Sequence, residues 1–267
     1  EVRLSDFDYE LRADRIAQSP VEPRDAARLL VDRGTHPPGH RHVRDLPELL
    51  QPGDLLVVNE TKVIPARLAL RRASGGAAEV LVLEPLDGAR RVWEALVRPA
   101  RKLRPGEQLF APDGTAVVEI GERHGGSSGD TFEVALLGSV DSLDVLQQHG
   151  EMPLPPYITE RLAEPDRYQT VYARRPGSAA APTAGLHFTP GLLSELEALG
   201  VAQAKVELVV GLDTFRPVTE DDPLRHVMHT ERYRVSAETM ERCRAARRVV
   251  AVGTTSLAVL LLPAWSL

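Results

Sequence analysis

Hydrophobic and polar positions follow two different patterns along the chain. Residues 52–59 form a turn and a short, fully apolar strand, preceded by a helix-like segment at 46–50. From residue 66 to 137 helical periodicity fades, and Gly, Pro and Asp turns separate short β-rich runs at 79–83, 92–97, 116–120 and 132–137. This middle block predicts a small all-β barrel or sandwich.

After residue 150 the pattern alternates between helix and strand. Thr189 suits an N-cap, Pro190 suits the first helical position, and Gly200 suits the left-handed end of that helix. Further signals predict a strand at 206–210, a helix capped by Ser236 and an apolar strand at 249–252. We therefore predict an α/β fold, with an α/β main domain built from both ends of the chain, 1–65 and 148–267, and a small all-β barrel domain inserted at 66–147.

Composition places the chain among ordinary globular proteins, with 43% hydrophobic and 26% charged residues. The longest apolar run, 257–265, is too short to span a bilayer, and the start of the chain does not resemble a signal peptide. A single cysteine, Cys243, suits a reducing compartment, so we expect a cytoplasmic protein. The net charge of -6 argues against a protein coated with nucleic acid, although residues 67–104 carry nine Arg or Lys against four Asp or Glu.

Histidines are the first candidates for chemistry, because the usual nucleotide, zinc and redox motifs are absent. His36, His40 and His42 lack regular spacing, so we interpret them as surface loop residues rather than metal ligands. His226 and His229, with Glu231, fit a polar site that exchanges protons near neutral pH. A hydrogen-bonded structural pair is the equally open alternative, and zinc binding is less favoured.

Polar loops follow three predicted strands. They are NETKVIPAR at 59–67, AAAPTAGLHF at 179–188 and VGTTS at 252–256. Ligands of α/β folds bind outside the carboxyl ends of strands, and small residues let backbone amides approach a ligand closely. Each loop alone is commonly just a tight turn, but three in one chain favour a ligand crevice.

A fourth segment combines rigidity with aromatic faces. Prolines stiffen MPLPPYI at 152–158, and RYQTVYA follows at 167–173. Tyr157, Tyr168 and Tyr172 offer flat faces for stacking a base. A packed linker between domains is the alternative interpretation.

Taken together, these segments resemble the S-adenosylmethionine:tRNA ribosyltransferase-isomerase family of queuosine biosynthesis. The resemblance runs from Leu4 to Ser256 through LSDFDYELRADRIAQSPVEPRDAARLLV, PGDLLVVNETKVIPARL, GEMPLPPYI, RYQTVYARRPGSAAAPTAGLHFT, GLDTFRPV, HVMHTERYRV and VAVGTTS. It implies an α/β domain with an inserted β-barrel, in agreement with the patterns above.

The resemblance also implies a reaction. Such an enzyme transfers the ribosyl part of S-adenosylmethionine to the aminomethyl nitrogen of 7-aminomethyl-7-deazaguanine in tRNA. A base removes a proton next to the sulfonium, the ribose opens, adenine leaves, the amine attacks, and ring closure to an epoxycyclopentanediol expels methionine. The product is epoxyqueuosine. No metal is implied, and we expect a monomer that does not bind membranes.

The residues that we expect to serve this reaction fall into four groups. The candidate bases are His187, His229 and His226, of which we favour His187. The S-adenosylmethionine site comprises Thr183, Ala184, Gly185, Gly253, Thr254 and Thr255. The acceptor site comprises Asn59, Thr61, Lys62, Arg67, Tyr157, Tyr168, Gln169 and Tyr172. The tRNA phosphates are expected at Arg98, Arg101, Lys102 and Arg104.

Two departures from the family pattern keep alternatives open. Val209 stands where the family has a His, and the family sequence continues for roughly a quarter of its length beyond GTTS, with an Arg, a Glu and a TNFHLP segment that do not follow here. We therefore expect a divergent or C-terminally truncated member. The alternatives are a paralogue that acts on a small-molecule acceptor and a catalytically inactive protein that binds tRNA or a nucleoside.

Overall fold

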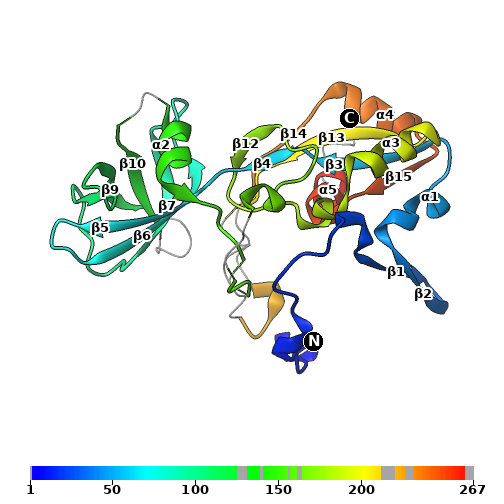
Figure 1. Cartoon of the computed structure of the whole chain (residues 1–267), viewed down its shortest axis with the longest axis horizontal. Helices are drawn as coiled ribbons and strands as arrows, with labels where there is room; N and C mark the ends of the chain where they lie inside the picture. Colours follow the sequence, from blue (N-terminus) through cyan, green and yellow to red (C-terminus); the bar gives the residue numbers. More distant parts are fainter. Residues whose placement is uncertain are drawn as a thin grey trace.

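The chain folds into two bodies that lie side by side, a β-barrel and an α/β unit (Figure 1). A computed structural model describes residues 2–124, 131–138, 141–155, 157–160, 164–211, 220–225 and 231–261. The α/β unit contains segments from before and after the barrel, which confirms the predicted fold class. The barrel strands run from Arg67 to Leu136, and the division at residues 66 and 147 stays a prediction.

A four-stranded sheet organises the α/β unit. Its order is β14 (Tyr233–Val235), β13 (Ala202–Leu208), β3 (Asp54–Asn59) and β15 (Arg248–Ala251). Strand β3 pairs in parallel with β13 and β15, whereas β14 is antiparallel. Every residue of β3 is buried, as expected for a strand covered on both faces.

Alternate side chains of β3 enter two separate cores. Leu56 and Val58 pack with Leu192 and Leu196 of α3 (Pro190–Ala198), and Leu55 and Val57 pack in the cluster that includes Val259 of α5 (Gly253–Leu261). The unit also contains α1 (Leu46–Leu49) and α4 (Ala237–Ala245). The predicted caps of α3 and α4 are confirmed, because the Thr189 and Ser236 hydroxyls accept hydrogen bonds from the first turns of these helices.

The inserted body is a closed antiparallel barrel. Its strands are β5 (Arg67–Arg72), β6 (Ala77–Pro85), β7 (Val92–Arg98), β10 (Thr131–Leu136), β9 (Ala116–His124) and β8 (Gln108–Phe110), in that order, and β8 pairs back to β5. Buried residues such as Trp93, Phe132 and Leu68 fill the interior. The four predicted runs are confirmed as β6, β7, β9 and β10, whereas β5 and β8 were not predicted from the sequence.

Smaller elements complete the chain. They are the hairpin β1 (Arg28–Arg33) and β2 (His36–His42), the parallel pair β4 (Thr61–Val63) and β12 (Arg175–Ser178), α2 (Ser142–His149), β11 (Gly150–Glu151), and the 3-10 turns η1 (Leu4–Phe7), η2 (Ala13–Arg15), η3 (Arg24–Ala26), η4 (Val43–Asp45), η5 (Pro165–Tyr168), η6 (Thr183–His187) and η8 (Pro223–Arg225). The predicted loop histidines at 36, 40 and 42 lie on the strand β2 instead. Within the described ranges, no helix has the length and apolar character to cross a membrane.

The chain crosses from the α/β unit to the barrel near Pro65 and crosses back near Gly150, and these two crossings are in direct contact. Strand β11 on the return crossing pairs with β5, which places Gly150 opposite Leu68 and Glu151 opposite Arg67. A side chain at Gly150 would overlap the carbonyl oxygen of Pro65 on the outgoing crossing. The close backbone contact therefore requires glycine at this position.

An ion pair between a buried carboxylate and a half-exposed arginine fixes the start of β3. The Asp54 carboxylate is fully buried, accepts hydrogen bonds from the Arg248 guanidinium on β15 and from the Gln51 amide (2.8 Å), and so joins two strands and a turn. The hydrogen bonds from Arg248 lower the pKa of Asp54, although burial alone would raise it. The pair is stabilising only while Asp54 is ionised.

We predict that Asp54→Asn lowers the free energy of unfolding at pH 7 by about 1–3 kcal/mol, because the amide leaves charged and N–H partners unpaired. The pKa of Asp54 is lower in the folded state than in the unfolded chain. Its contribution is therefore complete above about pH 4, the unfolded value, and is lost as the pH falls through the folded value. Urea unfolding at pH 7 and at about pH 2 measures this, with the exposed Asp14→Asn as control. An equal deficit of Asp54→Asn at both pH values would contradict the assignment.

We also predict that Gly150→Ala destabilises the protein by about 1–3 kcal/mol, because backbone atoms of Pro65 and Leu146 occupy the space of the new methyl group. Gly88→Ala is the matched control, since nothing lies within 4 Å of its Cβ position. Thermal unfolding of both variants tests this. Equal melting temperatures would show that the crossings can separate without cost.

Candidate functional site

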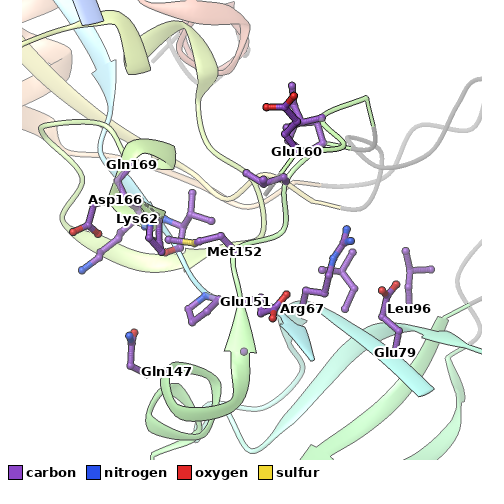
Figure 2. A pocket seen from close by; sticks show the side chains of 18 of the residues that line it. Lys62, Arg67, Glu79, Leu96, Gln147, Glu151, Met152, Glu160, Asp166 and Gln169 are labelled. Carbon is purple, nitrogen blue, oxygen red and sulfur yellow. Dashed lines mark hydrogen bonds between the residues drawn. The ribbon is translucent and has the colours of Figure 1, made fainter. Parts of the chain in front are cut away.

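A cavity of about 1110 Å³ lies where the barrel meets the α/β unit (Figure 2). Both crossings and both bodies contribute to its wall. The polar lining residues are Lys62, Arg67, Glu79, Arg98, Gln147, Glu151, Thr159, Glu160, Asp166 and Gln169. Apolar side chains that include Leu81, Leu96, Met152, Leu154 and Ile158 complete the lining. This volume is sufficient for a nucleoside-sized ligand.

Charges of both signs face the cavity. Three cations, Lys62, Arg67 and Arg98, stand with the carboxylates of Glu79, Glu151, Glu160 and Asp166. Arg98 and Glu79 form a loose pair at 4.0 Å, and the Arg67 Nε is buried with no hydrogen-bond partner among the described residues. A buried N–H without a partner is costly, so Arg67 is suited to bind an acceptor on a ligand.

Four predicted acceptor-site residues have structural partners of their own. The Gln169 side-chain amide donates to the Val63 carbonyl (2.7 Å) and accepts from its N–H (3.0 Å). The buried Asn59 amide donates to the Leu208 carbonyl (3.0 Å), and the Thr61 hydroxyl lies 2.9 Å from the same oxygen. Tyr168 packs with Val63 beneath the cavity. These side chains hold the cavity wall in place, and of the four only Gln169 also lines the cavity, as Lys62 and Arg67 do.

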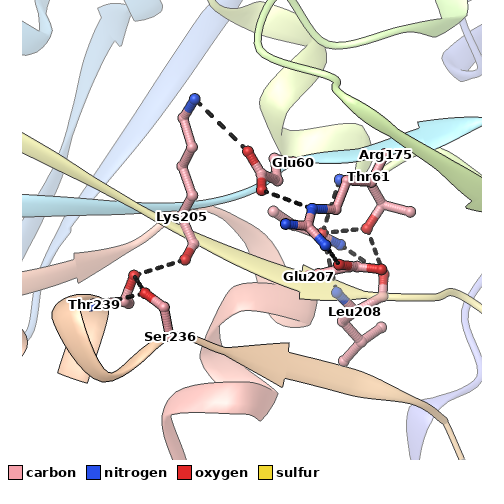
Figure 3. Close-up of polar contacts among 9 residues, drawn as sticks. Glu60, Thr61, Arg175, Lys205, Glu207, Leu208, Ser236 and Thr239 are labelled. Carbon is pink, nitrogen blue, oxygen red and sulfur yellow. Dashed lines mark hydrogen bonds and ion pairs between the residues drawn. The ribbon is translucent and has the colours of Figure 1, made fainter.

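A charged cluster holds the bend between β3 and β4 (Figure 3). Glu60 lies 3.6 Å from Arg175 of β12 and 3.7 Å from Lys205 of β13, and Arg175 lies 3.4 Å from Glu207. The main chain supports the same bend, because Glu60 donates to the Val206 carbonyl (2.9 Å). The chain here leaves the sheet for β4, which directs Lys62 toward the cavity.

The predicted S-adenosylmethionine loops meet each other. Gly253 starts α5 at a φ of 82°, and its Cβ position lies 3.0 Å from the Ala184 Cβ of η6. Gly185 packs on the Tyr172 hydroxyl and on Thr170, so a larger residue does not fit there. The structure therefore brings 183–187 and 253–255 together, as the strand-end argument predicts. Thr254 is exposed at this junction, while the Thr255 hydroxyl is buried.

Two aromatic predictions differ in their surroundings. Tyr172 is buried edge-on against Phe188 with ring centroids 6.5 Å apart, and burial raises the pKa of Tyr172 well above its usual value. Its ring is part of the core. Tyr157, by contrast, is 55% exposed beside the cavity segment.

The structure describes one of the three candidate bases, His187. His187 is exposed at the end of η6, and its Nδ1 lies 3.2 Å from the Ala184 carbonyl oxygen. His226 and His229 lie outside the described residues. Their neighbour Glu231 accepts a hydrogen bond from the Gly211 N–H (3.2 Å). In the described part of the chain, no group of three or more His, Cys, Asp or Glu side chains could hold a metal ion.

Arg24 links the cavity wall to η6. Its guanidinium donates to the carbonyl oxygens of Gln169 (2.6 Å), Asp166 (3.1 Å) and Leu186 (3.4 Å). Leu186 packs in turn against the cluster of Val63, Tyr168 and Ala181 behind the cavity. The N-terminal arm thus joins the cavity to the loop that carries His187.

The predicted phosphate-binding residues lead away from the cavity. Arg98 lines it at the end of β7, and Arg101, Lys102 and Arg104 follow as exposed residues on the connection to β8. Sequence reasoning missed Glu79, Gln147, Glu151, Glu160 and Asp166 as cavity residues. Only Glu151 had a usable signal, because it belongs to the GEMPLPPYI stretch.

Comparison with known proteins defines the class to which this fold and site belong. Residues 4–263 match the model of the family described as queuosine biosynthesis protein. The chain is 53% identical over 97% of its length to the S-adenosylmethionine:tRNA ribosyltransferase-isomerase of Symbiobacterium thermophilum, of which it covers 76%. It is 51% identical over 95% of its length to the enzyme of that name from Moorella thermoacetica, of which it covers 75%.

The chain therefore belongs to the queuosine biosynthesis protein family, which confirms the resemblance seen in the sequence. A crystal structure of the S-adenosylmethionine tRNA ribosyltransferase from Thermotoga maritima matches with 33% identity and a TM-score of 0.43, over 97% of this chain and 74% of that one.

We predict that Arg24→Met loosens the cavity wall and η6 together, because three carbonyl oxygens lose their donor. Amide hydrogen exchange should accelerate in peptides covering 164–189 and stay unchanged in the barrel. Arg12→Met is the matched control, since Arg12 is exposed on the same arm and pairs with Asp14. Identical exchange patterns in the two variants would show that Arg24 does not hold these segments.

Proposed function

We propose that this chain is an S-adenosylmethionine:tRNA ribosyltransferase-isomerase. It transfers and isomerises the ribosyl moiety of S-adenosylmethionine onto 7-aminomethyl-7-deazaguanine in tRNA, gives epoxyqueuosine, and releases adenine and methionine. The observation that carries the proposal is the identity of 53% over 97% of the chain with a relative of that name. The reaction belongs to the cytoplasm, where tRNA is modified, and we propose a monomer with residues 66–147 as its inserted domain.

The cavity between the two bodies is the proposed acceptor site. A deazaguanine presents N–H donors on its pairing edge, and its aminomethyl group is a cation when protonated. The carboxylates of Glu79, Glu151 and Asp166 can accept from these groups, and Lys62 and Arg67 can bind the adjoining phosphate or sugar. Tyr157 supplies an exposed ring for stacking beside the cavity.

The junction of η6 and α5 is the proposed site of S-adenosylmethionine. Small residues at 183–185 and 253 leave the backbone accessible, and Thr254 offers an exposed hydroxyl to the ribose or the methionyl carboxylate. Leu186 and Arg24 connect this junction to the cavity wall, so the proposed S-adenosylmethionine site adjoins the proposed acceptor site.

His187 is the proposed general base. The sulfonium acidifies the adjacent carbon, and an imidazole near neutral pH is suited to accept that proton. Ring opening then expels adenine, the acceptor amine attacks, and ring closure expels methionine as a neutral thioether. Because a neutral thioether leaves readily, we propose that the step proceeds without a metal.

The phosphates of the tRNA are proposed to bind Arg98, Arg101, Lys102 and Arg104. These residues extend from the cavity lining along an exposed connection of the barrel. Contacts of this kind fix the orientation of a nucleic acid and carry little sequence information.

Release of adenine and methionine from S-adenosylmethionine tests the proposed function. We expect release with tRNA that carries 7-aminomethyl-7-deazaguanine and none with the same tRNA carrying guanine. Release with the free deazaguanine alone would indicate a small-molecule acceptor instead. A folded protein that binds the tRNA without releasing adenine would be a binding protein and would end the enzyme proposal.

His187→Gln should lower kcat by about 10²–10⁴-fold if His187 is the base, because this is the usual contribution of a general base. His149→Gln on α2 is the matched control and should retain activity. A His187→Gln variant with wild-type kcat would transfer the role to another residue, with His229 tested next.

A further inference from the structure

A basic β-hairpin projects from the α/β unit at the end remote from the barrel (Figure 1). Strands β1 and β2 form it, and most of their residues are exposed. Residues 28–44 carry four arginines, three histidines and a single acidic residue in a chain whose net charge is -6. This surplus of three positive charges is separate from the basic connection at 98–104.

Strand pairing distributes the cations over both faces of the hairpin. Arg28 stands opposite His42 and Leu30 opposite His40, on a face where Leu30 is 60% exposed. Arg41 stands opposite Leu29 on the other face, and the Arg33 guanidinium reaches over Gly39, 3.6 Å from its Cβ position. The base of this second face meets the α/β core through Leu29.

These arginines have no carboxylate partner in the part of the chain that the structure describes. Among the described residues, none of Arg28, Arg33, Arg41 and Arg44 lies within ion-pair distance of a carboxylate. The one acid of the segment, Asp32, accepts instead from the Gly34 N–H (2.9 Å) and thereby holds the hairpin turn. The hairpin therefore presents a net positive charge that is available to an external anion.

The shape of the hairpin indicates which kind of anion it can bind. No hairpin residue lines the described cavity, so the hairpin does not enclose a small ligand there. A projecting ribbon with cations on both faces suits a polyanion with regularly spaced charges, such as a phosphate backbone. The cavity is lined by residues of the barrel and of the adjoining α/β unit, and the basic connection belongs to the barrel. The hairpin lies at the opposite end of the α/β unit (Figure 1).

We propose that the hairpin is a second tRNA-binding surface, which contacts phosphates outside the anticodon arm while the modified base occupies the cavity. The inference rests on the proposed function for the identity of the RNA. It predicts that the α/β unit, as well as the barrel, holds the substrate, and that the hairpin contributes to affinity and not to chemistry.

The test compares two triple variants that remove the same charge. The hairpin variant is Arg28→Gln with Arg33→Gln and Arg41→Gln, and the control is Arg234→Gln with Arg242→Gln and Arg244→Gln, which are exposed on β14 and α4. Binding is measured over a series of salt concentrations with full-length acceptor tRNA and with its isolated anticodon stem-loop. Circular dichroism and thermal unfolding establish that both variants are folded.

We expect the hairpin variant to bind full-length tRNA roughly tenfold more weakly than the control, with a slope of log K against log salt that is smaller by about 2–3. Its affinity for the stem-loop and its kcat at saturating tRNA should match the control. Equal affinities of the two variants for full-length tRNA would overturn the proposal, as would an equal loss with the stem-loop. A loss of binding to anionic lipid vesicles with tRNA binding intact would also overturn it.

The two proposals fail in different ways. If wild-type protein releases no adenine with any tRNA but the hairpin still governs full-length tRNA binding, the reaction is wrong and the hairpin surface stands. If adenine is released normally and the hairpin variant binds tRNA like the control, the hairpin inference alone is wrong.

Discussion

Contact between the two chain crossings is the constraint on which the rest of the site depends. The backbones at Pro65 and Gly150 meet without an intervening side chain, and β11 then pairs with β5. Because of this contact, Lys62, Arg67 and Glu151 face a common cavity although they belong to different bodies. Gln169, which follows the return crossing, adds a second link, because its side chain bonds to the main-chain N–H and carbonyl of Val63, which precedes the outgoing crossing. The shape of the cavity therefore depends on the contact between the two crossings more than on either body alone.

Polar burial at the end of β3 serves the same purpose. Asn59 and Thr61 are buried, and their side chains bond to the main chain of Leu208, so their own polar groups are paired where the chain passes from one sheet to the next. The mostly buried Glu60 carboxylate adds ion pairs with Arg175 and Lys205 at this bend. A polar loop after an apolar strand thus has two uses in this fold, since part of it builds the bend and part of it reaches the cavity.

Sequence patterns predicted the fold better than the site. Apolar runs, caps and turn residues are local signals, and they identified β3, α3, α4 and most barrel strands. Strand β5 was hidden because RLALRR has only three consecutive apolar residues between arginines and shows no clear alternation, and β8 because three residues carry little periodicity. The cavity carboxylates Glu79 and Asp166 were hidden for another reason. They are brought together only by pairings between distant segments, to which no spacing in the chain corresponds.

The closed barrel begins and ends at neighbouring points, which affects how such a protein can change in evolution. For the α/β sheet, the segment between β4 and β11, which contains the whole barrel, is equivalent to one short loop whose two ends are in contact. The entropy of closing a loop rises only slowly with its length. Insertions, deletions or even exchange of barrel segments therefore cost the α/β core little, provided that the two joined ends are kept. Substrate range can diversify through the barrel while the parts that hold the reacting groups remain the same.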